Sequence, residues 1–417
     1  MNPKAPSTVL TAETKPARVP KLRFPAFRGA DGWKLAPLSQ LATRTKQKNR
    51  DEKITRVLTN SAEFGVMDQR DFFDKEIATQ GNLESYFVVE LGSYVYNPRI
   101  SATAPVGPIS KNKVGTGVMS PLYTVFKFKD GGNDFYEHYF KTTGWHTYMR
   151  QASSTGARHD RMAISSDDFM AMPLPVPTPK EQQKIAECLS SVDDLIAAQA
   201  RKVDVLKTHK KGLMQQLFPR EGETQPHLRF PEFQNAGEWE LKAIGDVFRV
   251  TRGEVLSMTL VKDVASSEAP FPVYSSQTKN KGLAGYYSEH LYEDAITWTT
   301  DGANAGDVNF RPGKFYCTNV CGVLINTHGY ANACVAALLN SVTRRHVSYV
   351  GNPKLMNGVM AKIEIPLPSV PEQQHIAACL SSLDDLITLE TQKLEALKTH
   401  KKWLMQQLFP STGEVEA

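Results

Sequence analysis

The sequence has few cysteines and no long apolar run, and both absences narrow the class of protein. Five cysteines in 417 residues are too few, and odd in number, for a disulfide framework, so we expect a reducing, cytoplasmic location. The longest apolar run is far shorter than the 18 or more residues of a membrane span, so no membrane association is expected. Residues 1–21 lack the apolar core of a secretory signal and are expected to form a disordered tail. The length predicts two or more domains.

The motifs of the common catalytic sites are also missing. There is no GxxxxGK[ST] phosphate loop, and no glycine-rich nucleotide fingerprint follows a strand. Asn-Pro occurs at 97–98 and 352–353, but Arg or Lys follows, where an amino-methyltransferase loop has Pro and an aromatic residue. Neither a nuclease metal motif nor an acid paired with a nucleophile stands out. We therefore predict no catalytic residue.

One cluster has metal-binding residue types. Cys317 and Cys321 are four apart, with His328 and Cys334 nearby, but this spacing fits no common zinc pattern. Small buried side chains are the better interpretation. We predict no metal site and no cofactor bound by this chain.

The sequence also has no large excess of positive or negative charge. The formal net charge is +5. Residues 36–172 carry 17 Lys and Arg against 15 Asp and Glu, and residues 242–365 carry 12 against 10. Such a balance permits nucleic-acid binding but does not require it.

What the sequence does contain is an internal repeat. Residues 181–219 and 372–410 align without a gap and are identical at 27 of 39 positions. A shorter motif precedes each copy, LRFPAFRGADGWKL at 22–35 and LRFPEFQNAGEWEL at 228–241, with 8 of 14 identities. The order is motif, unique stretch and helix-like segment, twice. This order predicts two related but unequal halves.

Each long repeat predicts one helix with a coiled-coil seam. Aliphatic residues recur at alternating steps of four and three, and a seam of this kind needs a facing helix. Thr178 to Glu181 and Ser369 to Glu372 fit a capping box, and Pro219 and Pro410 end the segments. The predicted seam residues are Ile185, Leu189, Val192, Ile196, Leu206, Leu213, Ile376, Leu380, Leu383, Ile387, Leu397 and Leu404.

The partner of each helix and the polar seam positions leave alternatives open. A homodimeric coiled coil is one, but two copies in one chain favour pairing with each other. The polar residues Gln199, Lys210, Glu390 and Lys401 either fix the register or lie where the seam is open. The KTHKK sequences at 207–211 and 398–402 either complement the helix dipole in solvent or contact DNA.

The unique stretches predict mostly β modules with polar loops. Short runs of β-branched and aromatic residues alternate with Gly, Asn and Pro. Several loops combine Arg, Lys, Asn and Gln, which read base edges, with Ser, Thr and Gly, which hold phosphates. Each loop alone fits an ordinary exposed turn, but their number in each stretch favours a DNA-binding surface. The candidate DNA-binding residues are Arg44, Lys46, Lys48, Arg50, Lys111, Lys113, Arg158, Arg252, Gln277, Lys279, Asn280 and Lys281.

Together these segments resemble the specificity subunit of type I restriction-modification enzymes over nearly the whole chain. The resemblance lies in PLPVPTPKEQQKIAECLSSVDDLI and PLPSVPEQQHIAACLSSLDDLI, in LMQQLFP at both helix ends, and in the LRFP motifs. NSAEFGVMDQR (60–70) and PVYSSQTKNKGLAGYY (272–287) look like parts of two different target-recognition domains.

The resemblance implies an α+β fold, in which two long antiparallel helices with a pseudo-twofold internal repeat separate two mostly β target-recognition domains. Each domain would read one half of a bipartite, asymmetric site in double-stranded DNA. The helices would set the spacer and dock two methyltransferase subunits, which bring S-adenosylmethionine. Restriction subunits that use ATP and Mg would complete the complex, and this chain would be non-catalytic.

The expected boundaries are 22–172 and 220–365 for the two domains, 173–219 and 366–410 for the spacer helices, and 411–417 for a tail. Two other functions remain possible at this point. A self-contained methyltransferase or nuclease would need a cofactor loop that the sequence does not show. A helical-hairpin adaptor would use its β modules to bind protein instead of DNA.

Overall fold

The computed structural model describes residues 18–72, 83–130, 134–153, 160–276 and 279–410. The chain divides into two compact units. Unit 1 is Met1–Ala198 with Leu394–Ala417, and unit 2 is Gln199–Lys393. Both divisions fall inside the long helices, so each unit holds one sheet domain with half of each helix. The candidate residues Arg158 and Gln277 lie outside the described residues.

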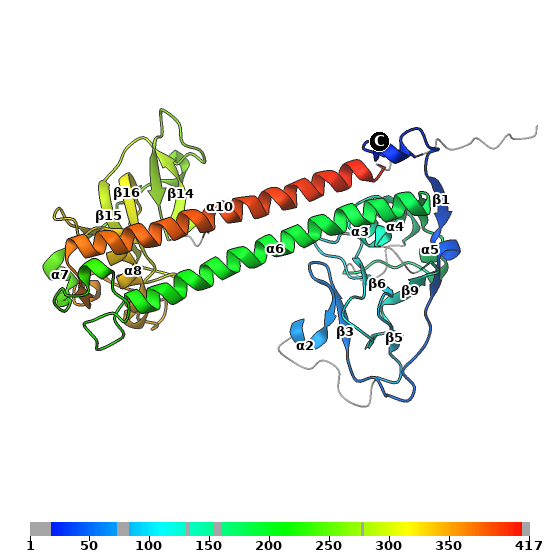
Figure 1. Cartoon of the computed structure of the whole chain (residues 1–417), viewed down its shortest axis with the longest axis horizontal. Coiled ribbons are helices and arrows are strands. Elements are labelled where there is room, and N and C mark those ends of the chain that lie inside the picture. The colour runs from blue at the N-terminus through cyan, green and yellow to red at the C-terminus, as the bar shows by residue number, and fades with distance from the viewer. Residues whose placement is uncertain (1–17, 73–82, 131–133, 154–159, 277–278, 411–417) are drawn as a thin grey trace, which may run out of the picture. The chain divides into compact units, whose positions relative to one another are not determined.

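The two repeated segments each form one continuous helix, α6 (Pro179–Leu217) and α10 (Val370–Leu408), each of 39 residues (Figure 1). Both end before the predicted Phe-Pro stop. In unit 1, Lys401 pairs with Asp193 across the two helices. In unit 2, Lys210 pairs with Asp384, and Gln199 Nε2 donates to Glu390 Oε2 at 2.7 Å. Residue numbers rise along one helix as they fall along the other, so the helix halves in each unit run antiparallel.

All twelve predicted seam residues are buried or half-buried. Ile185 and Leu189 enter the core of the first domain, and Ile376 and Leu380 enter that of the second. The polar seam positions make cross-helix contacts, because Lys210–Asp384 and Lys401–Asp193 are the same ion pair in the two copies. Pairing within one chain is thus the arrangement that the structure has.

The short LRFP motif joins the two helices in each unit. Arg23 forms a two-pronged ion pair with Glu181 near the start of α6, with N–O distances of 2.7 and 2.8 Å, while Leu22 N donates to Gln407 O of α10. In unit 2 Arg229 pairs with Glu372 at the start of α10 at 2.7 Å in both prongs. Leu228 N donates to Gln216 O of α6. The motif therefore ties the start of one helix to the end of the other.

The Arg23–Glu181 contact corrects one of the two hydrogen bonds predicted for the capping box at Thr178. Glu181 N donates to Thr178 Oγ1 at 3.3 Å, as a capping box requires. The Glu181 carboxylate, however, binds Arg23 instead of turning back to the N-cap amide. A guanidinium that satisfies both carboxylate oxygens is the stronger partner.

The first domain is built from short strands and short helices. Strand β1 (Lys34–Pro37) pairs antiparallel with β10 (Pro173–Val176), which leads into α6. A four-stranded sheet has the order β2-β9-β6-β7, and β3-β4 and β5-β8 form separate pairs. Trp33, Phe135 and Phe169 lie in one buried cluster with Leu408 and Phe409 of the α10 end. The remaining elements are η1 (Pro25–Phe27), α1 (Leu38–Leu41), β2 (Ala42–Arg44), β3 (Leu58–Ser61), β4 (Gly65–Asp68), α2 (Gln69–Phe72), β5 (Phe87–Val89), β6 (Tyr94–Tyr96), β7 (Ile109–Lys111), β8 (Gly117–Met119), β9 (Thr124–Phe128), α3 (Phe135–Phe140), α4 (His146–Ala152) and α5 (Ser166–Met170).

The second domain has one larger sheet. Six strands run in the order β12-β17-β15-β16-β13-β14, and helix α8 (Ala333–Val342) packs beside β16. Its core contains Trp239, Trp298, the last α6 residue Leu217 and the following Phe218. The other elements are η2 (Pro231–Phe233), β11 (Glu240–Ala243), α7 (Ile244–Val247), β12 (Arg249–Arg252), η3 (Met258–Leu260), β13 (Phe271–Tyr274), η4 (Lys279–Gly282), β14 (Leu283–Tyr287), β15 (Tyr292–Thr299), β16 (Val308–Cys317), β17 (Cys321–Ile325), η5 (Thr343–His346), α9 (Asn357–Met360) and β18 (Glu364–Leu367).

The two domains share their entry and exit although their sequences there differ. In both, a short 3-10 helix, a strand, one helical turn and a second strand follow the LRFP motif. The entry strand then pairs with the exit strand, β1 with β10 and β11 with β18. The structural repeat is thus longer than the sequence repeat. Among the described residues no helix is both long and apolar enough to cross a membrane.

Candidate nucleic-acid interface

In the second domain, the turn between β16 and β17 is the point where the predicted loops meet. The turn contains Thr318, Asn319 and Val320, and Cys321 N closes it by donating to Thr318 O at 3.0 Å. Its flanking residues Cys317 and Cys321 are buried, as the sequence predicted for them. Burial raises the pKa of the Cys321 thiol to about 11, so the thiol stays protonated. No metal-ligating group of His, Cys, Asp and Glu occurs in the described ranges.

The first loop to reach this turn follows β12. Gly253 N donates to Cys321 O at 2.9 Å, and Glu254 N donates to Cys317 O at 3.1 Å. A Cβ atom at Gly253 would lie 2.2 Å from the Cys317 oxygen, so only glycine allows this approach. The preceding residue, Arg252, is exposed beside the turn.

The second and third loops reach the same turn from the other strands. Thr318 Oγ1 donates to Ser275 Oγ at 3.0 Å, and Thr300 N donates to Val320 O at 3.0 Å. Asn304 Nδ2 contacts the Ser276 carbonyl at 3.4 Å, which links the two loops directly. The polar segments 251–253, 275–282 and 299–304 are separate in the sequence, where each fits a loop. The structure assigns Thr251 and Arg252 to the end of β12 and Thr299 to the end of β15, and it brings the described parts of the three segments together at this turn.

Two described candidates of this group, Asn280 and Lys281, have exposed side chains. For Lys279 only the main chain is described. The sequence missed Asn319, which is exposed at the apex of the turn where the loops meet. The signal in the sequence was the residue type, because asparagine can read adenine in the major groove. The cysteines on either side of the turn instead suggested only a possible metal site.

In the first domain, the candidates group around strand β5. The first residues of segment 43–50 pair with β9, and the segment then reaches β5, where Val88 N donates to Gln47 O at 2.9 Å. Asn112 borders the same strand from the other side, and its Nδ2 donates to Glu90 O at 3.0 Å and Gly115 O at 2.8 Å. Because Asn112 is completely buried, it fixes the shape of the loop at 111–117.

The positively charged candidates of segment 43–50 differ in how far their side chains are exposed to solvent. Lys46, Lys48 and Arg50 are exposed, and they form no ion pair within the described residues. Arg44 is half-buried, and its Nη1 donates to Ser166 Oγ on α5. Its charge is therefore less accessible than that of the other three residues.

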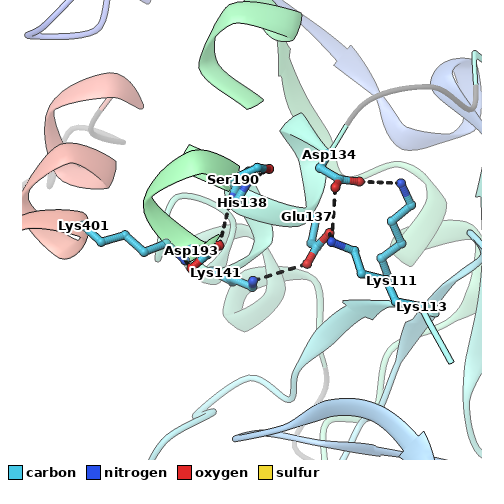
Figure 2. A network of polar contacts seen from close by, with 9 residues as sticks. All are labelled: Lys111, Lys113, Asp134, Glu137, His138, Lys141, Ser190, Asp193 and Lys401. Atoms are coloured by element: carbon cyan, nitrogen blue, oxygen red, sulfur yellow. Dashed lines mark hydrogen bonds and ion pairs between the residues drawn. The ribbon is translucent and has the colours of Figure 1, made fainter. Parts of the chain in front are cut away.

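Lys111 and Lys113 are engaged by helix α3 (Figure 2). Asp134 Oδ1 lies 2.6 Å from Lys111 Nζ, and Lys113 Nζ lies 3.1 Å from Asp134 and 2.7 Å from Glu137. Burial of Asp134 opposes ionisation, but hydrogen bonds from the two lysines outweigh it and hold the pKa of Asp134 below its usual value. The loop thus offers less free positive charge than its sequence suggests.

The other side of α3 contacts the helix pair (Figure 2). The His138 Nε2 atom lies 3.1 Å from Ser190 Oγ on α6, and its Nδ1 lies 4.0 Å from Asp193 Oδ2. Burial, assisted by Lys141 and Lys401, lowers the pKa of His138 to about 4, so the ring is neutral near pH 7. Helix α3 therefore connects the loop at 111–117 with the α6 and α10 halves of unit 1.

The family model and the relatives that match this chain all carry the description of a type I specificity domain or subunit. A family model described as the type I restriction modification DNA specificity domain matches residues 236–399. The N-terminus of a putative type I specificity subunit of Mycoplasma pneumoniae is 39% identical over 142 residues, 33% of this chain and 74% of that protein. The putative MjaX specificity subunit of Methanocaldococcus jannaschii is 26% identical over 268 residues, 61% of this chain and 62% of its own length.

Solved structures share the fold. A crystal structure of a type I restriction-modification S subunit from M. genitalium aligns with a TM-score of 0.60 at 15% identity, over 94% of this chain and all of the other. A chain from a study of complex assembly and conformational transition in a type I system aligns at 0.54 and 14% identity, over 91 and 98%. At these identities the likeness concerns the fold alone.

Proposed function

The chain belongs to the family of specificity subunits of type I restriction-modification systems, and we propose that it reads a bipartite DNA site for such a complex. The observation that carries the proposal is the meeting of three polar loops at the β16–β17 turn, within the region that matches the family model. Their exposed side chains are of the types that read base edges, and their backbone amides and hydroxyls suit phosphate contacts.

The two domains would each read one half of an asymmetric site. Their loops differ in sequence, their sheets differ in strand number and order, and they are carried by equivalent entry and exit strands. A shared frame with unlike reading surfaces suits two unlike half-sites. The candidates of each domain would serve that domain's half only.

The chain itself would be non-catalytic. The helix pair would set the spacer between the half-sites and dock two methyltransferase subunits, which would bring S-adenosylmethionine. Restriction subunits with ATP and Mg would join that core. The lack of catalytic motifs in the sequence supports this division, because a reading subunit needs none.

The test is to map methylated adenines in the host genome with and without the gene for this chain. We expect one bipartite motif that disappears on deletion and returns when the gene is restored. A motif that persists without the gene would contradict the proposal. Purified chain that methylates DNA without partner subunits would assign the catalysis to this chain instead.

A further inference from the structure

Arg311 on strand β16 is a buried arginine without a carboxylate partner in the part of the chain that the structure describes. It is 7% exposed, and none of the ion pairs of the described residues includes it. Taking a cation out of water is unfavourable unless other groups compensate for the lost hydration. Its neighbours are therefore informative about its role.

The guanidinium contacts Tyr274, directly before the polar segment 275–282, and Lys281, near the end of that segment. At the start, its central carbon lies 3.7 Å from the centroid of the Tyr274 ring, within the range of a cation–π contact. At the end, its Nη2 donates to Lys281 O at 2.7 Å. A third bond, from Nε to Thr297 Oγ1 at 3.0 Å, anchors it to β15.

The turn that Arg311 holds has an unfavourable backbone conformation. Asn280 and Lys281 have φ values of 51° and 52°, in the left-handed region that residues with a side chain seldom adopt. Two consecutive residues of this kind need support from their surroundings. The bond to Lys281 O, together with Ser275 N donating to Gly282 O at 2.8 Å, supplies it.

The start of the segment connects Arg311 to the β16–β17 turn. Tyr274, whose ring stacks on the guanidinium, accepts a hydrogen bond from Thr318 N at its carbonyl at 2.9 Å. Arg311 is therefore linked through Tyr274 to the turn where the loops meet, and its guanidinium contacts the recognition segment instead of an acidic residue.

We propose that Arg311 is a positioning residue, which fixes the Asn280–Lys281 turn so that the exposed side chains of that turn read one half of the DNA site. The inference rests on the proposed function. A planar group that stacks on a ring and donates in two directions is required, so lysine is not an equivalent substitute.

The test uses the full chain assembled with its methyltransferase subunits. Methylation rates are measured on duplexes with single base changes in each half of the motif. For Arg311→Met, which keeps a long side chain but removes charge and donors, we expect about 10-fold or greater loss of discrimination at one or more positions of one half. The other half is expected to keep full discrimination. Lys314→Met, on the same strand but exposed, is the matched control and is expected to change neither half.

A second pair of variants separates positioning from folding. Tyr274→Phe keeps the ring face and is expected to keep discrimination, whereas Tyr274→Leu removes the stacking partner and is expected to behave like Arg311→Met. If Arg311→Met does not fold, the two Tyr274 variants test the inference in its place. Equal base discrimination by Tyr274→Phe and Tyr274→Leu would overturn the inference.

The outcomes also separate the inference from the proposed function. A folded Arg311→Met complex that discriminates like the unchanged complex overturns the inference alone. Loss of discrimination in both halves, together with a lower melting temperature, shows a purely structural role and also overturns it. If the complex that contains the original chain, without any substitution, shows no sequence-specific methylation, the proposed function and the inference are both overturned.

Discussion

Arg23 and Arg229 make the same contacts in the two domains, and these contacts explain why the LRFP motif occurs twice. Each guanidinium binds a Glu whose side chain is 1% exposed, and also donates to two main-chain carbonyls of the loop that follows the motif. The hydrogen bonds to Glu372 raise the pKa of Arg229, so the guanidinium stays charged over the whole accessible pH range. The sequence shows both members of each pair as repeated, but their separation of 158 residues in the first domain hides the pairing.

Removing one member of such a pair tests its role. We expect Arg229→Met to lower the free energy of unfolding by about 3–5 kcal/mol, because Glu372 is left buried without a partner. The double variant Arg229→Met with Glu372→Met is expected to recover most of the loss. Urea unfolding gives both values. Arg345→Met is the matched control, since its pair with Glu221 is exposed and is worth about 1 kcal/mol or less.

Lys46, Lys48 and Arg50 allow a second test at the residue scale. If they contact phosphates, replacing all three with Ala lowers the slope of log affinity against log salt by about 0.9 for each phosphate that is no longer neutralised. The preferred sequence is expected to stay the same, because phosphate contacts carry no sequence information. Lys127→Ala, which removes an exposed lysine paired with Glu90, is the control. An unchanged slope in titrations of the assembled complex would show that the three residues do not contact DNA.

At the scale of elements, the helix pair was the most predictable part of the chain. Two copies of one apolar pattern, each ended by Phe-Pro, predicted both helices, because burial against a facing helix requires that spacing. The loops were less predictable. Their meeting at the β16–β17 turn depends on strand order, and β13 lies beside β16 through a parallel pairing that no local pattern encodes.

The hydrogen bonds that Glu390 accepts at the helix seam predict how the stability of the protein changes at acid pH. Hydrogen bonds from Gln199, Lys393 and Lys202 lower the pKa of Glu390 to about 2. A carboxyl whose pKa is depressed on folding stabilises the folded state fully above its unfolded pKa of 4.5, and this contribution is lost as the pH falls toward 2. We therefore expect Glu390→Gln to flatten the fall in stability between about pH 5 and 2.

Urea midpoints at pH 7, 5 and 3 measure this difference. Glu395→Gln, in the same helix but exposed and paired with Lys398, is expected to leave the profile unchanged. Identical acid profiles for Glu390→Gln and the original chain would mean that the seam contact does not favour the ionised carboxylate.

At the scale of the whole molecule, the repeat concerns the frame and not the reading surfaces. The LRFP motif, the paired entry and exit strands and the long helices recur, whereas the intervening segments form a four-stranded sheet in the first domain and a six-stranded sheet in the second. The sequence predicted this division in outline, since its repeated segments all lie in the frame. It understated the frame, because β1 with β10 and β11 with β18 pair through backbone bonds that tolerate different side chains.

Exchange of one reading surface tests this division most directly. Residues 244–363 lie between the paired strands of the second domain and can be replaced by the corresponding segment of another family member. Sequencing of methylated DNA made by the hybrid with its methyltransferase subunits gives the outcome. Our account predicts a motif in which one half changes while the other half and the spacer length are retained. A motif in which both halves change, or in which neither does, would contradict it.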